Sequence, residues 1–293
     1  MASDPRPDPI LGFYGPQSQM WRINREAVLL AAGPAALLLQ VAHPLVAEGV
    51  HQHSRFEADP PLRLRRTLRT TLALVFGDGP AAERAVRRLN GVHAGVRGQV
   101  DDPQARATTG LDAYRALDPA LLLWVQATLI QTSVAAYERW VGPVSAAERE
   151  RFWAEARSVG VRLGIPLSVS PSDWPAFEAY WAAMLAPEGP VHVTPTARRL
   201  GHTIAGSPLP FVPAPLLGPL MSPALSLLPR RLRDEYGFVW SPGRAALAGG
   251  IDAALRLWVR LLPVAWRSMP QARDADRRSR QSAATSRSAR AIE

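Results

Sequence analysis

The sequence predicts an all-α protein built as a single globular multi-helix domain. Apolar residues recur at spacings of three and four along most of the chain, and no segment shows the convincing alternation of apolar and polar residues that marks a half-buried strand. Prolines are frequent, 28 of 293 residues, and several stand directly after a capping residue, where helices begin. No internal repeat divides the chain. Together these observations favour one helical domain.

The first part of this domain is predicted to place an apolar helix at its centre. A Pro-rich lead-in over residues 1–19 precedes a short helix near residues 24–32. The helix that begins at Pro34 is apolar on all sides, which is typical of a helix buried in the middle of a domain. Pro44 either kinks this helix or begins a new one.

Caps and apolar stripes define the remaining elements. Asp59 is an N-cap for the next helix, and Ser145 and Glu148 match a capping box. Prolines crowd residues 207–229, so we expect short helices or irregular chain there, and residues 101–112 are predicted to form a loop or short turn. Helices are expected over residues 61–76, 80–96, 119–141, 146–163, 172–185, 195–202, 230–236 and 243–262.

The domain is predicted to span residues 20–268 and to end near Met269. From Arg267 onward seven arginines stand against three acidic residues in a stretch rich in serine and alanine. Such a composition buries little apolar surface, so residues 269–293 are predicted to form a basic, disordered tail.

The composition excludes several kinds of chemistry. The chain has no cysteine, so it cannot form disulfides, thiolate metal sites or iron–sulfur clusters. It also has no lysine, and all 34 basic residues are arginine, which excludes Schiff-base chemistry. No hydrolase elbow, phosphate-binding loop, dinucleotide fingerprint or HExxH pattern is present.

Net charge and hydropathy indicate which partners and which location to expect. The net charge of +9 is concentrated partly in the tail, so no nucleic-acid partner is expected. The apolar run over residues 27–47 is interrupted by Pro34, Gln40 and His43, which favours a buried helix pair over a membrane span. Residues 1–19 carry acids and prolines and no apolar core, so we expect no secretory signal and a cytoplasmic protein.

A polar stretch from residue 37 to residue 67 is the first candidate site. Glu48 lies within apolar sequence, so it either pairs with an arginine or acts as an acid or base with a shifted pKa. Arg63 and Arg66 form either a solvated helix face or a clamp for carboxylates or phosphates. Thr67 donates a hydrogen bond either to a ligand or to its own helix.

The histidines give a less specific pattern. His43, His51 and His53 do not match the i, i+4 pair of a helical zinc site. His43, which precedes Pro44, is expected to bond to backbone carbonyls that the proline leaves free. His93 stands beside an apolar stripe, where a histidine is either a hydrogen-bonded core residue or a metal or heme ligand.

A resemblance to a known family rests on six motifs. They read LLLQVAHPLVAEGVHQHSRF (37–56), RLRRTLRTTLALVFG (63–77), VHAGVRG (92–98), YRALDPALLLWVQATL (114–129), LPRRLRDEYGFVWSP (228–242) and RSMPQARDADRR (267–278). In this order they resemble the mpaB-type oxygenase family, which includes the rubber oxygenases known as latex clearing proteins. The likeness covers roughly residues 25–278.

The resemblance implies a helical domain around a b-type heme whose iron is held by one histidine. The matching position is His93. The family's Arg-x-x-Lys-Thr motif matches Arg63, Arg66 and Thr67, so an arginine stands where the rubber oxygenases have a lysine that can cap the iron. Because arginine does not deprotonate in proteins, we expect an open or water-filled distal side, with Arg63 and Arg66 binding propionates or lining that side and Thr67 shaping the oxygen pocket.

Two further positions follow from the resemblance. The family's Trp-Val-His-Ala-Thr motif has Gln126 in place of its histidine, so an amide takes over that role in the heme pocket. Glu48 falls near a carboxylate proposed as a base in rubber cleavage, and it is carried over as a candidate base.

These observations lead to one functional hypothesis and two alternatives. The hypothesis is a b-type heme-dependent oxygenase that uses dioxygen on an apolar isoprenoid or lipid-like substrate, with the oxygen chemistry supplied by the cofactor. The first alternative is a non-catalytic binder of heme or a lipophile. The second is a helical interaction protein without a cofactor, in which all six histidines are structural.

Overall fold

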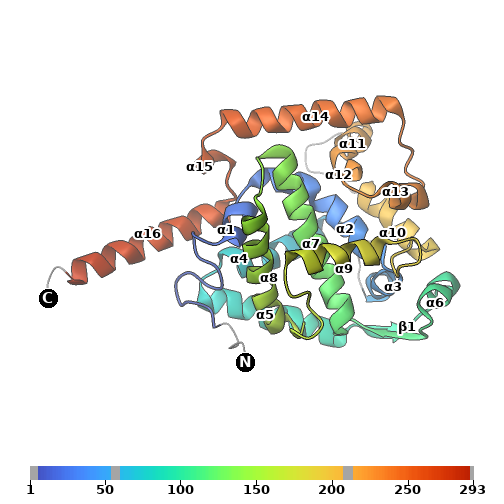
Figure 1. Ribbon diagram of the computed structural model, residues 1–293, viewed down its shortest axis with the longest axis horizontal. Coiled ribbons are helices and arrows are strands. Elements are labelled where there is room, and N and C mark those ends of the chain that lie inside the picture. The colour runs from blue at the N-terminus through green and yellow to red at the C-terminus, as the bar shows by residue number, and fades with distance from the viewer. Residues whose placement is uncertain (1–5, 54–59, 207–213, 291–293) are drawn as a thin grey trace.

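The computed structural model describes residues 6–53, 60–206 and 214–290, with only the backbone described for residues 60–66, 214–216 and 285–290. The described chain is predominantly helical and forms a single domain (Figure 1), which confirms the predicted all-α class. In chain order the helices are α1 (Gln19–Asn24), η1 (Ala27–Ala32), α2 (Gly33–Val41), α3 (Pro44–His53), α4 (Pro60–Phe76), α5 (Gly79–Gly95), α6 (Pro103–Thr109), α7 (Pro119–Trp140), α8 (Ala146–Gly160), η2 (Val161–Leu163), α9 (Trp174–Leu185), α10 (Pro195–Ala205), α11 (Ala214–Leu220), α12 (Ser222–Ser226), α13 (Arg230–Tyr236), α14 (Pro242–Leu261), α15 (Val264–Arg267) and α16 (Pro270–Arg290).

Helices α2 and α7 form the centre of the domain. Asp118 caps α7 by accepting a hydrogen bond from the backbone N–H of Ala120, and Pro119 occupies its first turn. The two helices pack against each other, and each is surrounded by other helices, so apolar residues occur all around them. The expected central position of the apolar helix after Pro34 is therefore confirmed.

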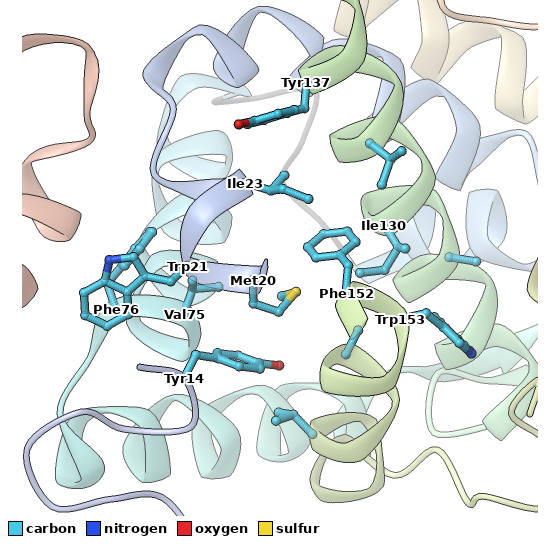
Figure 2. Close-up of a cluster of buried hydrophobic side chains, with 14 of the residues drawn as sticks. Tyr14, Met20, Trp21, Ile23, Val75, Phe76, Ile130, Tyr137, Phe152 and Trp153 are labelled. Carbon is cyan, nitrogen blue, oxygen red and sulfur yellow. The ribbon is translucent and has the colours of Figure 1, made fainter. Parts of the chain in front are cut away.

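Two hydrophobic clusters fill the space on either side of this pair. Figure 2 shows the first, in which Trp21 and Phe76 meet edge to face and Phe152 of α8 approaches Ile130 of α7. The second joins α2 to α10, α12 and α13, with the Tyr236 ring at its centre. Burial of such large side chains stabilises the fold by about 1.5–3 kcal/mol each.

One helix, α7, is long and apolar enough to cross a membrane, and most of that stretch is buried inside the domain. Two other segments, Ala27–Val41 and Pro44–His53, are long and apolar enough to cross a membrane only when taken together, and they meet at a bend of 103°.

The bend lies at the Pro44 position, so this proline begins a new helix. Its N–H is missing, and the Gln40 carbonyl accepts instead from the backbone N–H of His43 at 3.2 Å.

Two short strands interrupt the helical order, and sequence periodicity did not predict them. Strand β1 (Arg97–Gln99) pairs antiparallel with β2 (Ala113–Arg115), with Gly98 opposite Tyr114. Three residues are too few to display a period-two pattern, which explains the omission. The loop expected between them contains a helix, α6, which begins at the N-cap Asp102.

The expected disordered tail is the main correction to the predicted fold. Residues 270–290 form helix α16, whose first turns pack on the domain through Met269, Ala272 and Ala275. Asp276 accepts hydrogen bonds from Arg25 at 2.7 Å and from the Trp21 indole at 3.2 Å. These buried contacts hold the first turns of a helix that otherwise projects from the body of the molecule (Figure 1).

The other predicted helices agree with the structure to within a few residues, but α1 and α15 were not predicted, and the helix expected near residues 24–32 is the short 3-10 helix η1. The N-cap expected at Asp59 lies outside the described residues. The capping box at Ser145 and Glu148 is present, with each side chain bonding the other's backbone N–H. Where residues 207–229 are described, they contain the short helices α11 and α12, as expected from the prolines.

Candidate functional site

His93 lies in the last turns of α5 with its ring half-buried. Asp78 begins the helix by accepting a hydrogen bond from the backbone N–H of Ala81, and Ala82, Ala85 and Val86 fix its buried face. The Nδ1 atom of His93 is buried and has no hydrogen-bond partner within the described part of the chain. Burial lowers the pKa of His93, so its imidazole is neutral at neutral pH, as a metal ligand must be.

Asn90 fixes the helical turn that precedes His93. Its side-chain amide donates to the backbone carbonyl of Arg162 at 2.9 Å and so ties α5 to η2. Sequence reasoning missed this residue. Asn90 lies three residues before His93, on the same side of the helix, and this spacing could have identified it as a neighbour of His93.

Gln126 lies on α7 and faces the end of α8. Its Nε2 donates to the carbonyl of Ala156 at 2.9 Å, and its Oε1 is buried without a partner among the described residues. Gly160 allows this approach, because a Cβ there would lie 3.1 Å from Nε2. The segment from Ala156 to Arg162 therefore contacts both Gln126 and the turn that precedes His93.

Glu48 is fully buried on α3 and belongs to a hydrogen-bond network. Its Oε2 accepts from Gln52 Nε2 at 3.0 Å and from the backbone N–H of Asp101 at 3.1 Å. The Gln52 amide also reaches the Gln99 carbonyl at 2.9 Å, and the Tyr114 hydroxyl donates to Gln52 Oε1 at 2.7 Å. Glu48 thereby ties α3 to the chain that follows β1.

The network leaves one carboxylate oxygen of Glu48 available. Within the residues that the structure describes, Oε1 of Glu48 is buried and has no hydrogen-bond partner. Burial, together with the negative charges of Glu48 and Asp101, raises the pKa of Tyr114 to about 12, so the phenol stays protonated and donates. Gln52 and Tyr114 were not predicted, because their contacts depend on the strand pairing that the sequence did not reveal.

The network and His93 are joined by a short length of chain. Gly95 ends α5 and β1 begins at Arg97, so only three residues separate His93 from the strand. A Cβ on Gly49 would lie 3.5 Å from the Val96 side chain, which shows how closely α3 approaches this connection. The structure thus brings the helix of Glu48 against the end of the helix that carries His93.

The predicted anion clamp lies mostly outside the described side chains. Arg63 and Arg66 are on α4, of which the structure describes only the backbone at these positions. Thr67 is exposed rather than turned into the core. Its predicted role in an oxygen pocket and the predicted arginine clamp remain predictions.

The other histidines divide into one buried and several accessible rings. His43 is buried, and its Nδ1 has no partner within the described ranges, so the bond expected from its ring to a carbonyl is not made through this atom. The Gln40 carbonyl that Pro44 leaves free is taken by a backbone N–H instead. His51 is exposed, and His53 is exposed with its Nε2 at 2.9 Å from the Arg97 carbonyl.

The arrangement suits a cofactor that needs one protein ligand. Among the described residues no three His, Asp or Glu side chains gather closely enough to hold an ion. A non-heme iron centre of the common kind needs two histidines and a carboxylate, whereas a porphyrin brings four nitrogen ligands and needs one imidazole. The neutral, partly buried ring of His93 with its unpartnered nitrogen fits the second requirement.

Fold and site together define a helical protein with a half-buried candidate ligand, His93, and a fully buried carboxylate, Glu48. The chain belongs to the family described as ER-bound oxygenase mpaB/B'/rubber oxygenase, catalytic domain, whose model matches residues 20–264. The resemblance seen in the motifs is therefore confirmed. Membership supports oxygenase activity in general and implies a substrate, dioxygen and a metal or heme cofactor.

Curated relatives extend this similarity without adding a function. An uncharacterised protein of Mycobacterium tuberculosis is 29% identical over 238 residues, which cover 78% of this chain and 89% of the relative. An uncharacterised protein of Mycobacterium bovis matches with the same identity and coverage. No solved structure matches the chain significantly.

Proposed function

We propose that this protein is a b-type heme-dependent oxygenase, with His93 as the single protein ligand of the iron and an apolar isoprenoid or lipid-like molecule as substrate. The observation that carries the proposal is the His93 ring, which is neutral, partly buried and lacks a partner for Nδ1 within the described residues. Membership of an oxygenase family, in a chain whose described residues hold no close group of three metal-binding side chains, favours heme over a metal held by several side chains.

The chain's own residues would hold this ring and limit its access to water. Asn90 anchors the preceding turn to the Arg162 carbonyl, so the helix end cannot fray freely. The apolar helices α2 and α7 form the neighbouring interior. When bound, heme supplies the activation of dioxygen, and the protein supplies orientation and a dry environment.

Glu48 is the proposed base. Its Oε2 is held by Gln52 and by the Asp101 backbone, which leaves Oε1 buried and without a partner in the described part of the structure. A carboxylate fixed in this way has one oxygen free to accept a proton from a substrate carbon or from a water molecule.

Arg63, Arg66, Thr67 and Gln126 have proposed supporting roles. The two guanidinium groups would bind the heme propionates as bidentate partners. Thr67 would donate a hydrogen bond on the oxygen side. The Oε1 atom of Gln126, which has no partner among the described residues, would accept a hydrogen bond in the pocket where the family usually has a histidine. A cytoplasmic location remains a prediction.

A non-catalytic binder of heme or a lipophile is the second candidate. Gln126 favours it, because its amide is engaged with the Ala156 carbonyl and cannot replace the acid–base function of an imidazole. The replacement of the family's lysine by Arg66 points the same way.

Oxygen uptake separates these two functions. The hemin-loaded protein would be reduced, freed of reductant and mixed with oxygenated buffer containing squalene or a fatty acyl ester. An oxygenase consumes dioxygen only when substrate is present and incorporates labelled oxygen into the product. Glu48→Gln should slow this uptake by about 10²-fold or more, as expected for the loss of a positioned base, whereas Glu178→Gln, at an exposed position, should not. Substrate-independent uptake by the wild type would favour the binder.

A further inference from the structure

Helices α14 and α15 form one outer edge of the molecule, where α14 runs along its length (Figure 1). A narrow stripe of α14, marked by Ala248, Asp252 and Val259, is buried against α7, α11 and α12. Most of the remaining surface of this 20-residue helix is exposed. The helix therefore presents a broad face to its surroundings.

This exposed face is apolar, which is unusual for the outer side of a helix. Leu257 is 56% exposed, Leu261 71% and Trp266 75%. At about 100° per residue, Leu257 and Leu261 project opposite the buried stripe. We define the α14–α15 face by its six exposed large apolar residues, Leu247, Leu257, Trp258, Leu261, Val264 and Trp266. Several large apolar side chains exposed on one side of a helix are typical of an interaction site.

The charges around the face are of one sign. Residues 242–267 contain a single acid, Asp252, which is 3% exposed and accepts from Arg139 and from the Trp140 indole at 2.7 Å each. Arg256 and Arg260 are exposed and lie along one flank of the apolar strip, because residues four apart share a side of the helix. The face is therefore apolar with a cationic border.

We propose that the α14–α15 face docks on the surface of an anionic lipid bilayer, with α14 lying flat in the interface. A helix of this length is about 30 Å long and presents leucines for the acyl boundary, tryptophans for the headgroup level and arginines for lipid phosphates. The net charge of +9 would draw the protein toward such a surface before contact.

Charge argues against a second copy as the occupant. A twofold dimer through this face would bring two identical cationic borders together, and residues 242–267 hold no exposed acid to neutralise them. An anionic bilayer supplies the opposite charge along the whole helix. This inference goes beyond the proposed oxygenase function and does not depend on it.

The test is vesicle flotation of the full chain without added heme. Vesicles of phosphatidylcholine containing about one quarter phosphatidylglycerol should carry the wild type to the top of the gradient, and pure phosphatidylcholine should bind it several times more weakly. The double variant Leu261→Ser with Trp266→Ser should lower the partition coefficient at least about tenfold. Replacing Arg256 and Arg260 by Gln should remove most of the preference for anionic vesicles.

Leu111→Ser is the matched control. Leu111 is 48% exposed and lies between α6 and β2, and Figure 1 shows α6 far from α14, so its replacement should leave binding unchanged. Circular dichroism would confirm that every variant is folded.

The proposal is overturned if the wild type does not bind vesicles, or if the double variant of Leu261 and Trp266 binds them as tightly as the wild type. A concentration-dependent dimer that this variant abolishes, without vesicle binding, would assign the face to self-association. If the protein binds an acidic protein but does not bind vesicles, the proposal is also contradicted.

Discussion

At the residue scale, one buried and one half-buried histidine are kept neutral by the cost of placing a charge in an apolar environment. Burial lowers the pKa of His93, and it lowers that of His43 to about 4. For His43 the negative charge of Asp118 opposes the shift without cancelling it. The two rings differ in position, since His43 lies deep beside α2 whereas His93 is only half-buried at a helix end. Only His93 combines neutrality with access.

His43 should make stability depend on pH. Its folded-state pKa lies below the unfolded value of about 6.5, so the unfolded chain binds more protons between these values, and stability is lost as pH falls through that window. Between pH 7 and pH 5 this single group should lower the free energy of unfolding by roughly 2 kcal/mol.

Urea denaturation of the wild type and of His43→Gln at both pH values measures this contribution. The variant should lose roughly 2 kcal/mol less than the wild type over the same interval. Comparing the two proteins cancels the opposite contributions of Glu26 and Glu155, whose pKa values burial raises. Equal losses in both proteins would show that His43 titrates normally.

Single-residue reasoning identified His93, Glu48 and Gln126 as candidates but did not predict their partners. Asn90 was recoverable from its spacing to His93 on one helix. Gln52 and Tyr114 were not, because they meet Glu48 through a hairpin of three-residue strands. Partners that depend on non-local pairing leave no periodic signal in the sequence.

At the scale of elements, a close approach of helices positions α2. Gly201 of α10 lies against the Tyr236 ring of α13, and the Tyr236 hydroxyl donates to the Leu38 carbonyl of α2 at 2.7 Å. A Cβ on Gly201 would lie 2.4 Å from Cε1 of that ring. Because the ring is fully buried, it has little room to move.

Gly201→Ala should therefore lower the free energy of unfolding by about 2 kcal/mol, through overpacking that outweighs the better helix propensity of alanine. Gly250→Ala is the matched control on another helix. A Cβ there meets no described atom within 4 Å, so alanine should stabilise the protein by about 0.5–1 kcal/mol. Thermal or urea unfolding of the two variants checks the opposite signs, and a stabilised Gly201→Ala would refute the packing argument.

Helices were the elements that the sequence predicted best, because caps and prolines define their starts. The capping box at Ser145, the start of the long helix at Pro119 and the break at Pro44 all appear where expected. Helix α16 was missed for a different reason. Its composition is polar, and the few apolar residues that bury it, Met269, Ala272 and Ala275, do not form a stripe strong enough to predict packing.

At the scale of the whole molecule, α16 joins the C-terminal part of the chain to its first helix. Removal of residues 269–293 would expose the surface that Met269 and Ala272 cover and would leave Trp21 and Arg25 without Asp276. We expect this deletion to lower the free energy of unfolding by about 3 kcal/mol or more.

The matched deletion of residues 282–293 keeps these contacts and should change stability by less than about 0.5 kcal/mol. Urea denaturation of both shortened chains compares them. Equal stability of the chain that lacks residues 269–293 and of the full chain would contradict the packing of α16 and favour the predicted disordered tail.

Titration of the purified protein with hemin, followed by its absorption spectrum, shows whether this chain holds heme through His93. We expect a Soret band that saturates at one equivalent in the wild type and in His51→Ala, whose histidine is exposed. In a folded His93→Ala protein the band should be lost and should return when imidazole is added. A folded wild type that stays colourless, or a His93→Ala protein with an unchanged band, would contradict the claim.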